Sequence, residues 1–267
     1  MNPVIEKHTV AQSFGNAAPD YDQFARVQHL VAEQLIAQCP ELQNPNGRIL
    51  DLGCGTGYCL PLLAKRYPSA KIEGADISQG MLTYAQEHYP QFSYHLADAE
   101  SLPFDENQFQ LIFSNFAVQW CDAFSVVLEQ LYRCLQPGGF VVLSTLADGT
   151  LNEIKSAWAE VDQYQHVNDF ETADALEQSV DESGFSVQAL SMHTEVQYYQ
   201  NLRELTDSLK RIGAHNMTSG RARTVTSPGA VKQFKQAMER FRLEAGLPAS
   251  YQVLTCVLQK PTHQQQA

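Results

Sequence analysis

Apolar residues in the first half of the chain alternate between two spacings, and this alternation predicts an open α/β sheet. An apolar run at 48–52 leads into a glycine-rich turn at 53–57, and residues 58–67 then carry apolar side chains at helical spacing. Strand, tight loop and helix in that order form the first unit of such a sheet, whose ligands lie at the carboxyl ends of the strands. We therefore expect the glycine-rich turn to line a pocket.

The same alternation continues to the end of the chain. We predict further strands at 71–76, 92–96, 109–115, 140–145, 187–196 and 251–258, which makes a mostly parallel sheet of seven strands. Helices are predicted at about 78–88, where Ser78 can serve as the N-cap, and at 124–135. Residues 135–140 read as a turn into the fifth strand, because Pro137 is followed by two glycines.

Three segments exceed this minimal sheet. Residues 1–44 form a helical arm with a helix at about 24–39, ahead of a single domain at 45–260 and a flexible tail at 261–267. Insertions at about 148–181 and 199–247 leave the sheet at the carboxyl ends of its strands, so we expect both to roof the active site. Ser227 and Pro228 begin a helix in the second insertion.

Composition narrows the possible partners. The 267 residues are 44 % hydrophobic and carry a net charge of −12, which suits one globular domain and argues against nucleic acid as the main partner. We find neither an apolar run of membrane-spanning length nor an apolar signal region at the N-terminus, so we expect a cytoplasmic protein without a membrane partner. The six cysteines form no C-x-x-C pair and no zinc-like cluster with histidine, so we predict reduced thiols and no metal.

Basic residues gather in one part of this acidic chain. Residues 203–242 contain nine of the eighteen Lys and Arg residues and only three acids, a local charge of +6. Such a surface suits one acidic partner that docks at one place. The alternative is an ordinary solvated helix face.

The glycine-rich turn also indicates its ligand. A dinucleotide site has G-x-G-x-x-G, whereas this turn has G-x-G-x-G with Asp51 just before it. A carboxylate there would repel a pyrophosphate but attract an ammonium group, and Asp76 at the tip of the next strand can accept both hydroxyls of a ribose. An ammonium, a ribose and no phosphate describe S-adenosylmethionine. A glycine turn without a ligand and an NAD site are the alternatives.

These residues resemble the class I S-adenosylmethionine-dependent methyltransferases. The resemblance implies a Rossmann-like three-layer α/β fold, with 51–57 at the methionine end of the cofactor, Asp76 at the ribose and 98–100 at the adenine. It also implies that the N-terminal arm folds over the cofactor. The candidate cofactor-binding residues are Tyr21, Asp51, Gly53, Cys54, Gly55, Gly57, Asp76, Ile77, Met81, Asp98, Ala99, Glu100, Asn115 and Gln119.

A narrower resemblance concerns the acceptor. Residues 13–21, 114–121, 157–170 and 210–214 are similar to the malonyl-[acyl-carrier protein] O-methyltransferases of biotin synthesis, except at Asn16, where that family often has arginine. The resemblance implies methylation of the free carboxyl of malonyl-[acyl-carrier protein], with the carrier docked on 203–242. The candidate catalytic residues are Tyr21 and Trp120, which would shape the line between donor and acceptor, and Arg211 or Arg221, which would hold the carboxylate.

Other interpretations remain open at this point. Tyr21 can instead pack within the arm, and Trp120 can be a core anchor for the helix that follows it. The chain can be a methyltransferase of another small acid or of a quinone, which would need no carrier protein. It can also be a regulatory protein that binds S-adenosylmethionine without catalysis. We expect a monomer in each case.

Overall fold

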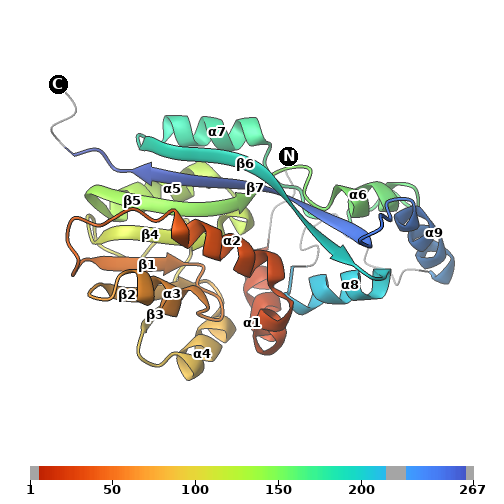
Figure 1. The fold of residues 1–267 in the computed structure, drawn as a ribbon, viewed down its shortest axis with the longest axis horizontal. Helices are drawn as coiled ribbons and strands as arrows, with labels where there is room; N and C mark the ends of the chain where they lie inside the picture. The colour runs from red at the N-terminus through yellow and green to blue at the C-terminus, as the bar shows by residue number, and fades with distance from the viewer. Residues whose placement is uncertain (1–5, 215–226, 263–267) are drawn as a thin grey trace.

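A seven-stranded sheet forms the centre of the protein, in the computed structural model that describes residues 6–214 and 227–262. The strands lie in the order β3-β2-β1-β4-β5-β7-β6, and β7 runs in the direction opposite to the other strands (Figure 1). Their bounds are β1 Arg48–Leu52, β2 Lys71–Asp76, β3 Ser93–Leu96, β4 Phe109–Asn115, β5 Leu135–Leu146, β6 Ser186–Tyr199 and β7 Leu247–Gln259. The predicted class I methyltransferase fold is confirmed.

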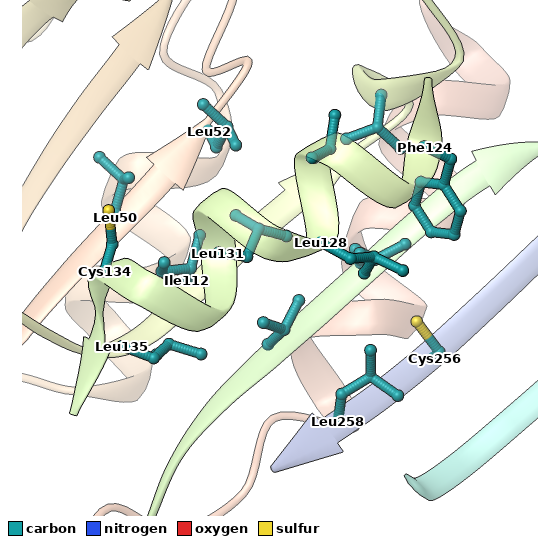
Figure 2. Packing of buried hydrophobic residues seen from close by; sticks show 14 of the residues in the cluster. Leu50, Leu52, Ile112, Phe124, Leu128, Leu131, Cys134, Leu135, Cys256 and Leu258 are labelled. Atoms are coloured by element: carbon teal, nitrogen blue, oxygen red, sulfur yellow. The ribbon is translucent and has the colours of Figure 1, made fainter. Parts of the chain in front are cut away.

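Helices cover both faces of the sheet because its central strands are apolar on both sides. In β1, Ile49 packs with α2 (Arg26–Ala37) and α3 (Cys59–Arg66), whereas Leu50 and Leu52 pack with α5 (Phe124–Cys134). Figure 2 shows α5 lying across the strands on that second face. Side chains alternate between faces along a strand, so a nearly continuous apolar run is what a doubly covered parallel strand needs.

The order in which strands are added to the sheet reverses between β1 and β4. These two strands are parallel neighbours in the sheet, although two other strands separate them in sequence. Connections from these two strands leave toward opposite sides, and the crevice between them is where open α/β sheets bind ligands. The loops after β1, β2 and β4 all reach this crevice.

The N-terminal arm differs from the single helix predicted at 24–39. It forms two helices, α1 (Lys7–Phe24) and α2, separated at Ala25. Helix α1 lies against α4 (Gln79–His88), where Gly15 and Gly80 meet so closely that a Cβ on Gly80 would lie 2.7 Å from the Cα of Gly15. Helix α1 buries only two of its side chains, Val10 and Ala18, and contains Gly15 and Pro19, so periodicity gives a weak signal for it.

The two last strands are long and extend beyond the rest of the sheet (Figure 1). Residues 253–259 of β7 pair with both β5 and β6, whereas residues 247–252 pair with β6 alone. This overhang carries α6 (Asn152–Ala159), α8 (Leu202–Arg211) and α9 (Pro228–Glu239). The remaining helix of the first insertion, α7 (Ala173–Glu182), packs instead against α5.

Two predicted helix caps are confirmed, and one predicted turn is wrong. Ser78 caps α4 by accepting a hydrogen bond from the amide of Met81, and Ser227 caps α9 through the amide of Ala230. Residues 135–140 were expected to be a turn but belong to β5, because Leu135 already pairs with Phe109 and the irregularity is absorbed as a bulge. In the described part of the chain, no helix has the length and apolarity needed to cross a membrane.

Candidate functional site

Two cavities meet at the carboxyl-end edge of the sheet. The smaller one, of about 100 Å³, we call the cofactor cavity, because most of the predicted cofactor-binding residues line it. The larger one, of about 840 Å³, we call the acceptor cavity, and it lies among α6, α8 and α9. Four aromatic residues line both cavities and thus form the wall between them: Phe14, Tyr21, Phe116 and Trp120.

Nine of the predicted cofactor-binding residues line the cofactor cavity: Tyr21, Gly53, Gly55, Asp76, Ile77, Met81, Asp98, Ala99 and Asn115. Gln119 lines the acceptor cavity instead. Cys54 and Gly57 lie on the far side of the glycine-rich loop, where their neighbours are Gly74 and Tyr89 respectively. The loop can follow this course because Gly53 has φ +73°, and a Cβ there would lie 2.1 Å from that of Ala117.

Asp51 offers a buried carboxylate at the carboxyl end of β1. Its side chain is 2 % exposed, and within the described chain its Oδ2 atom has no hydrogen-bond partner. Burial, and next the nearby charge of Asp76, raise the pKa of Asp51 to about 8. A buried acceptor without a partner costs free energy unless a ligand supplies the donor. Asp51 is not itself among the residues that line the cofactor cavity, but it lies two residues before Gly53, which is, so its free oxygen suits an ammonium group bound at that end.

Asp76 connects the glycine-rich loop to the start of α4. Its Oδ2 accepts from the amide of Gly55 at 2.9 Å, and its Oδ1 accepts from the amide of Ser78 at 2.8 Å. Burial raises the pKa of Asp76, while these backbone hydrogen bonds oppose the shift. A carboxylate so fixed at a strand tip fits the two hydroxyls of a ribose.

Lys7 closes the other end of the cofactor cavity, where an adenine was predicted. Its Nζ atom lies 2.6 Å from Oδ2 of Asp98 and 2.5 Å from Oε2 of Glu100. Although partial burial opposes it, these two hydrogen bonds raise the pKa of Lys7. The other oxygen of Glu100 accepts from the amide of Ala123, ahead of α5. Lys7 therefore joins the first turn of α1 to the loop after β3.

Asn115 and Phe116 fix the tip of β4 between the two cavities. The Asn115 amide donates to the carbonyl of Gln28 at 3.0 Å, and its oxygen accepts from the hydroxyl of Ser144 at 2.9 Å. Phe116 follows with φ +51°, a conformation that is rare for a side chain of this size. Residues held in such conformations concentrate at functional sites, and this one presents its ring to both cavities.

The aromatic wall is a packed unit. Phe14 contacts Trp120 edge to face, with ring centroids 5.3 Å apart, and it contacts Tyr21 at 6.3 Å. Burial, and next the charges of Asp22 and Asp76, raise the pKa of Tyr21, so its hydroxyl stays protonated and can donate a hydrogen bond. Trp120 therefore lines both cavities and contacts Phe14 of α1. A residue that served only to anchor the following helix in the core would not need to line either cavity.

Apolar side chains make most of the acceptor cavity. One stripe of α8 and its C-cap contributes Leu202, Leu205, Leu209 and Ile212, and α6 and α9 face it with Ile154, Trp158 and Phe234. Trp158 stacks on Phe234 with centroids 4.2 Å apart and on His166 at 3.7 Å. Gln119 contributes a polar atom: its amide nitrogen donates to the carbonyl of Phe116, whereas its Oε1 is buried without a described partner.

Basic side chains stand at the solvent side of the acceptor cavity. Arg203, Lys210 and Lys235 line it and are exposed, and we call these three residues the basic rim. Arg211 lines neither cavity: it pairs with Asp20 of α1 and lies over the ring of Phe24. Arg221 lies outside the described residues. The carboxylate-binding role predicted for these two arginines stays a prediction.

Sequence reasoning missed several residues that line the cavities. Lys7, Phe14 and Phe116 were not singled out, and neither were the basic rim residues individually. A weak signal existed for Phe116, because it directly follows the tip of a strand at the ligand-binding edge. No comparable signal existed for Lys7, whose partners lie more than ninety residues away along the chain.

Comparisons with known proteins bear on the family and on the fold of the chain. A family model described as "Methyltransferase domain" matches residues 49–139. A bifunctional protein of biotin biosynthesis (BioHC) from Cellvibrio japonicus is 43 % identical over 96 % of this chain and 51 % of its own length. The chain thus spans about half the length of such bifunctional relatives.

Two further comparisons concern full-length similarity and fold. A malonyl-[acyl-carrier protein] O-methyltransferase from Methylococcus capsulatus is 37 % identical over 96 % of this chain and 94 % of its own length. Geranyl diphosphate C-methyltransferase from Streptomyces coelicolor, crystallised with S-adenosyl-L-homocysteine, aligns with a TM-score of 0.55 and 14 % identity, covering 88 % of this chain and 80 % of its own. The second likeness concerns the fold alone.

Proposed function

The chain belongs to the malonyl-[acyl-carrier protein] O-methyltransferase family, and from that premise we propose that it transfers a methyl group from S-adenosylmethionine to the free carboxylate of malonyl-[acyl-carrier protein]. The products would be the methyl ester and S-adenosylhomocysteine, in the synthesis of biotin that the names of its relatives specify. The observation that best supports this is the meeting of two cavities at one aromatic wall.

Binding of the donor would use the acids at the strand tips. Asp51 supplies a buried acceptor for the ammonium group, and Asp76 supplies acceptors for the ribose hydroxyls. Bound S-adenosylmethionine supplies an electrophilic methyl group on a sulfonium. Asn115 and Phe116, at the tip of β4, lie where the donor and the acceptor would meet.

The proposed reaction needs no general base from the protein. A carboxyl group has a reference pKa of about 4, so the acceptor is already an anion at neutral pH and needs no general base. The residues around it have to align the two reactants and exclude water, effects that are worth about 7–11 kcal/mol when the geometry is good. A rigid wall of Phe14, Tyr21 and Trp120 suits that task.

The basic rim supports docking of an acidic carrier. Among the basic residues at 203–242, several already pair with acids, as Arg203 does with Asp207 and Arg240 with Glu160. Lys210 and Lys235 line the acceptor cavity, and neither makes a salt bridge with a described acid. The charge of Lys235 nevertheless acts, after that of Arg242, to lower the pKa of Glu239, which lines the same cavity. We propose that Lys210 and Lys235 attract the carrier protein and the phosphate of its phosphopantetheine arm, with rates that fall as salt rises.

One incubation tests the proposal. The protein is mixed with S-adenosylmethionine labelled in the methyl group and with malonyl-[acyl-carrier protein], and base-labile methyl ester is measured. We expect turnover on the carrier-bound acid and little on free malonate. The Asp51→Asn variant should lose most of this activity, whereas Asp174→Asn, an exposed change on α7, should not. Transfer to free malonate at the carrier's rate would favour the small-acid alternative.

A further inference from the structure

Helix α1 covers the cofactor cavity along its length. It contributes Lys7, Val10, Phe14 and Tyr21 to the lining, at spacings of three, four and seven residues. Those spacings place the four side chains on one side of a helix. A ligand in the cofactor cavity therefore lies against α1, and its release is expected to require movement of this helix.

Hydrogen bonds attach α1 to the loops around the cofactor cavity. The hydroxyl of Thr56, in the glycine-rich loop, donates to Oδ1 of Asp22 at 2.8 Å. The hydroxyl of Ser78, the N-cap of α4, donates to the carbonyl of Ala11 at 2.7 Å. Together with the ion pairs of Lys7, these bonds join α1 to the loops after β1, β2 and β3.

The C-terminal end of α8 contacts the same helix beside the aromatic wall. Arg211 pairs with Asp20, and the hydroxyl of Ser13 donates to the carbonyl of Gly213 at 3.1 Å. The two backbones meet closely here, since a Cβ on Gly213 would lie 3.1 Å from the carbonyl oxygen of Ser13. Each of the contacted residues of α1, Ser13 and Asp20, directly precedes a residue of the aromatic wall.

From this arrangement we propose that Asp20 and Arg211 are positioning residues, which hold the aromatic wall in place through the contact between α8 and α1. This inference rests on the proposed function and adds a link between its two substrates. The apolar stripe of α8 and Lys210 line the acceptor cavity, so a carrier arm bound there stabilises α8. Helix α8 then holds α1 over the donor. Arg211 acts on Asp20 rather than on the acceptor carboxylate, since it lines neither cavity.

The link sets an order of events. A bound carrier slows the release of S-adenosylhomocysteine, so the methylated carrier leaves first. Linkage requires that S-adenosylhomocysteine tighten the binding of the carrier by the same factor at equilibrium. The side chains of Arg211 and Asp20 are 54 % and 45 % exposed. Because an exposed ion pair changes an equilibrium by about fivefold at most, removing this one should weaken the link by about two- to fivefold.

The release of S-adenosylhomocysteine in the presence of malonyl-carrier protein tests the link, because these two ligands cannot react with each other. The dissociation rate is measured by stopped flow with and without saturating malonyl-carrier protein. We expect the carrier to slow release about fivefold or more in the wild-type protein, and Asp20→Asn and Arg211→Met each to lose about two- to fivefold of that slowing. The charge swap Asp20→Arg with Arg211→Asp should restore it. Glu41→Gln removes the exposed partner of Arg66 on α3 and is the matched control, which should behave as the wild type.

These variants separate positioning from direct binding of the acceptor. If Arg211 held the acceptor carboxylate, Arg211→Met would lower kcat/KM far more than Asp20→Asn, and the charge swap could not restore it. Either result would overturn the inference. Gly213→Ala tests the same contact without a change of charge, because its Cβ would meet the carbonyl of Ser13, and it should also reduce the slowing.

The remaining outcomes distinguish the inference from the proposed function. Melting temperatures, and the affinity for S-adenosylhomocysteine without carrier, show which variants fold. Slowing that is equal in the wild type and in every folded variant would overturn the inference. So would its absence in a wild-type protein that forms the methyl ester, and the proposed function would then still stand. Absence of methyl ester from malonyl-carrier protein in the wild type would remove both.

Discussion

The affinity for S-adenosylhomocysteine should pass through a maximum near pH 8 because of Asp51. The product has the same ammonium group as the donor and permits equilibrium measurement without turnover. Binding needs Asp51 ionised and the ligand amine protonated, so the apparent dissociation constant is the intrinsic one divided by the fraction in both states. The pKa of Asp51 is raised to about 8, and an α-amino group has a reference pKa of about 8.

The size of the effect follows from these two values. At pH 8 the fraction of protein with Asp51 ionised, multiplied by the fraction of ligand with its amine protonated, is about a quarter. At pH 6 this product is only about one in a hundred. The affinity should therefore fall about 25-fold from pH 8 to pH 6, and about threefold from pH 8 to pH 9 as the amine loses its proton. An Asp51 with an ordinary pKa near 4 would give the opposite trend, about twofold tighter binding at pH 6 than at pH 8.

Isothermal titration calorimetry at fixed ionic strength measures this dependence from pH 6 to pH 9. Repeating it at pH 7 in two buffers of different protonation enthalpy counts protons, and we expect close to one to be released on binding. The Asp51→Asn variant should bind S-adenosylhomocysteine more weakly and should lose most of the fall in affinity between pH 8 and pH 6. The surface change Asp174→Asn should keep that fall. A dissociation constant that does not rise between pH 8 and pH 6 would refute the reasoning.

Three further predictions concern stability and the cofactor cavity. Because the pKa of Asp51 is raised in the folded state, the contribution of Asp51 to stability is full below about pH 4 and is lost as pH rises toward about 8. The melting temperature of the ligand-free protein should therefore fall between pH 5 and pH 8. The fall should be smaller in the Asp51→Asn variant. Lys7→Met should speed dissociation of S-adenosylhomocysteine in stopped-flow measurements and raise KM for the donor with little change in kcat, and Lys7→Arg should restore both, because either cation can reach Asp98. Arg48→Met removes the bidentate partner of Glu73, but Arg48 is partly exposed and Glu73 keeps His95 and Lys71 as partners, so the change should cost about 1–3 kcal/mol in urea unfolding without altering the affinity for S-adenosylhomocysteine.

The cofactor half of the site was predictable because its residues lie close together in sequence. The loop at 53–57 and the acids Asp51 and Asp76 follow strands that end at the same edge of the sheet, so their convergence follows from parallel pairing alone. Burial on both faces of those strands made their apolar runs easy to recognise.

The acceptor half was less predictable because its residues come from distant parts of the chain. Its lining runs from Phe14 in α1 to Tyr251 in β7, and no short motif marks such a set. Arg211 illustrates the difficulty: its charge suggested a carboxylate site, yet its partner Asp20 lies 191 residues away and is an ordinary ion-pair partner on α1. Helix α1 itself was missed because it buries only Val10 and Ala18 and because Gly15 and Pro19 lower its helix propensity.

The division within β7 has a consequence for how such enzymes can diversify. Residues 253–259 pair with β5 and belong to the sheet that carries the donor site. Residues 247–252 pair with β6 alone and support the acceptor side. A chimaera joined at this boundary, with residues 247–252, α8 and α9 taken from another methyltransferase, would change the outer lining of the acceptor cavity and leave Asp51 and Asp76 in place. The wall of Phe14, Tyr21, Phe116 and Trp120 would stay, because these residues line both cavities. Substrate choice is thus separable from methyl-donor recognition only on the outer side of that wall.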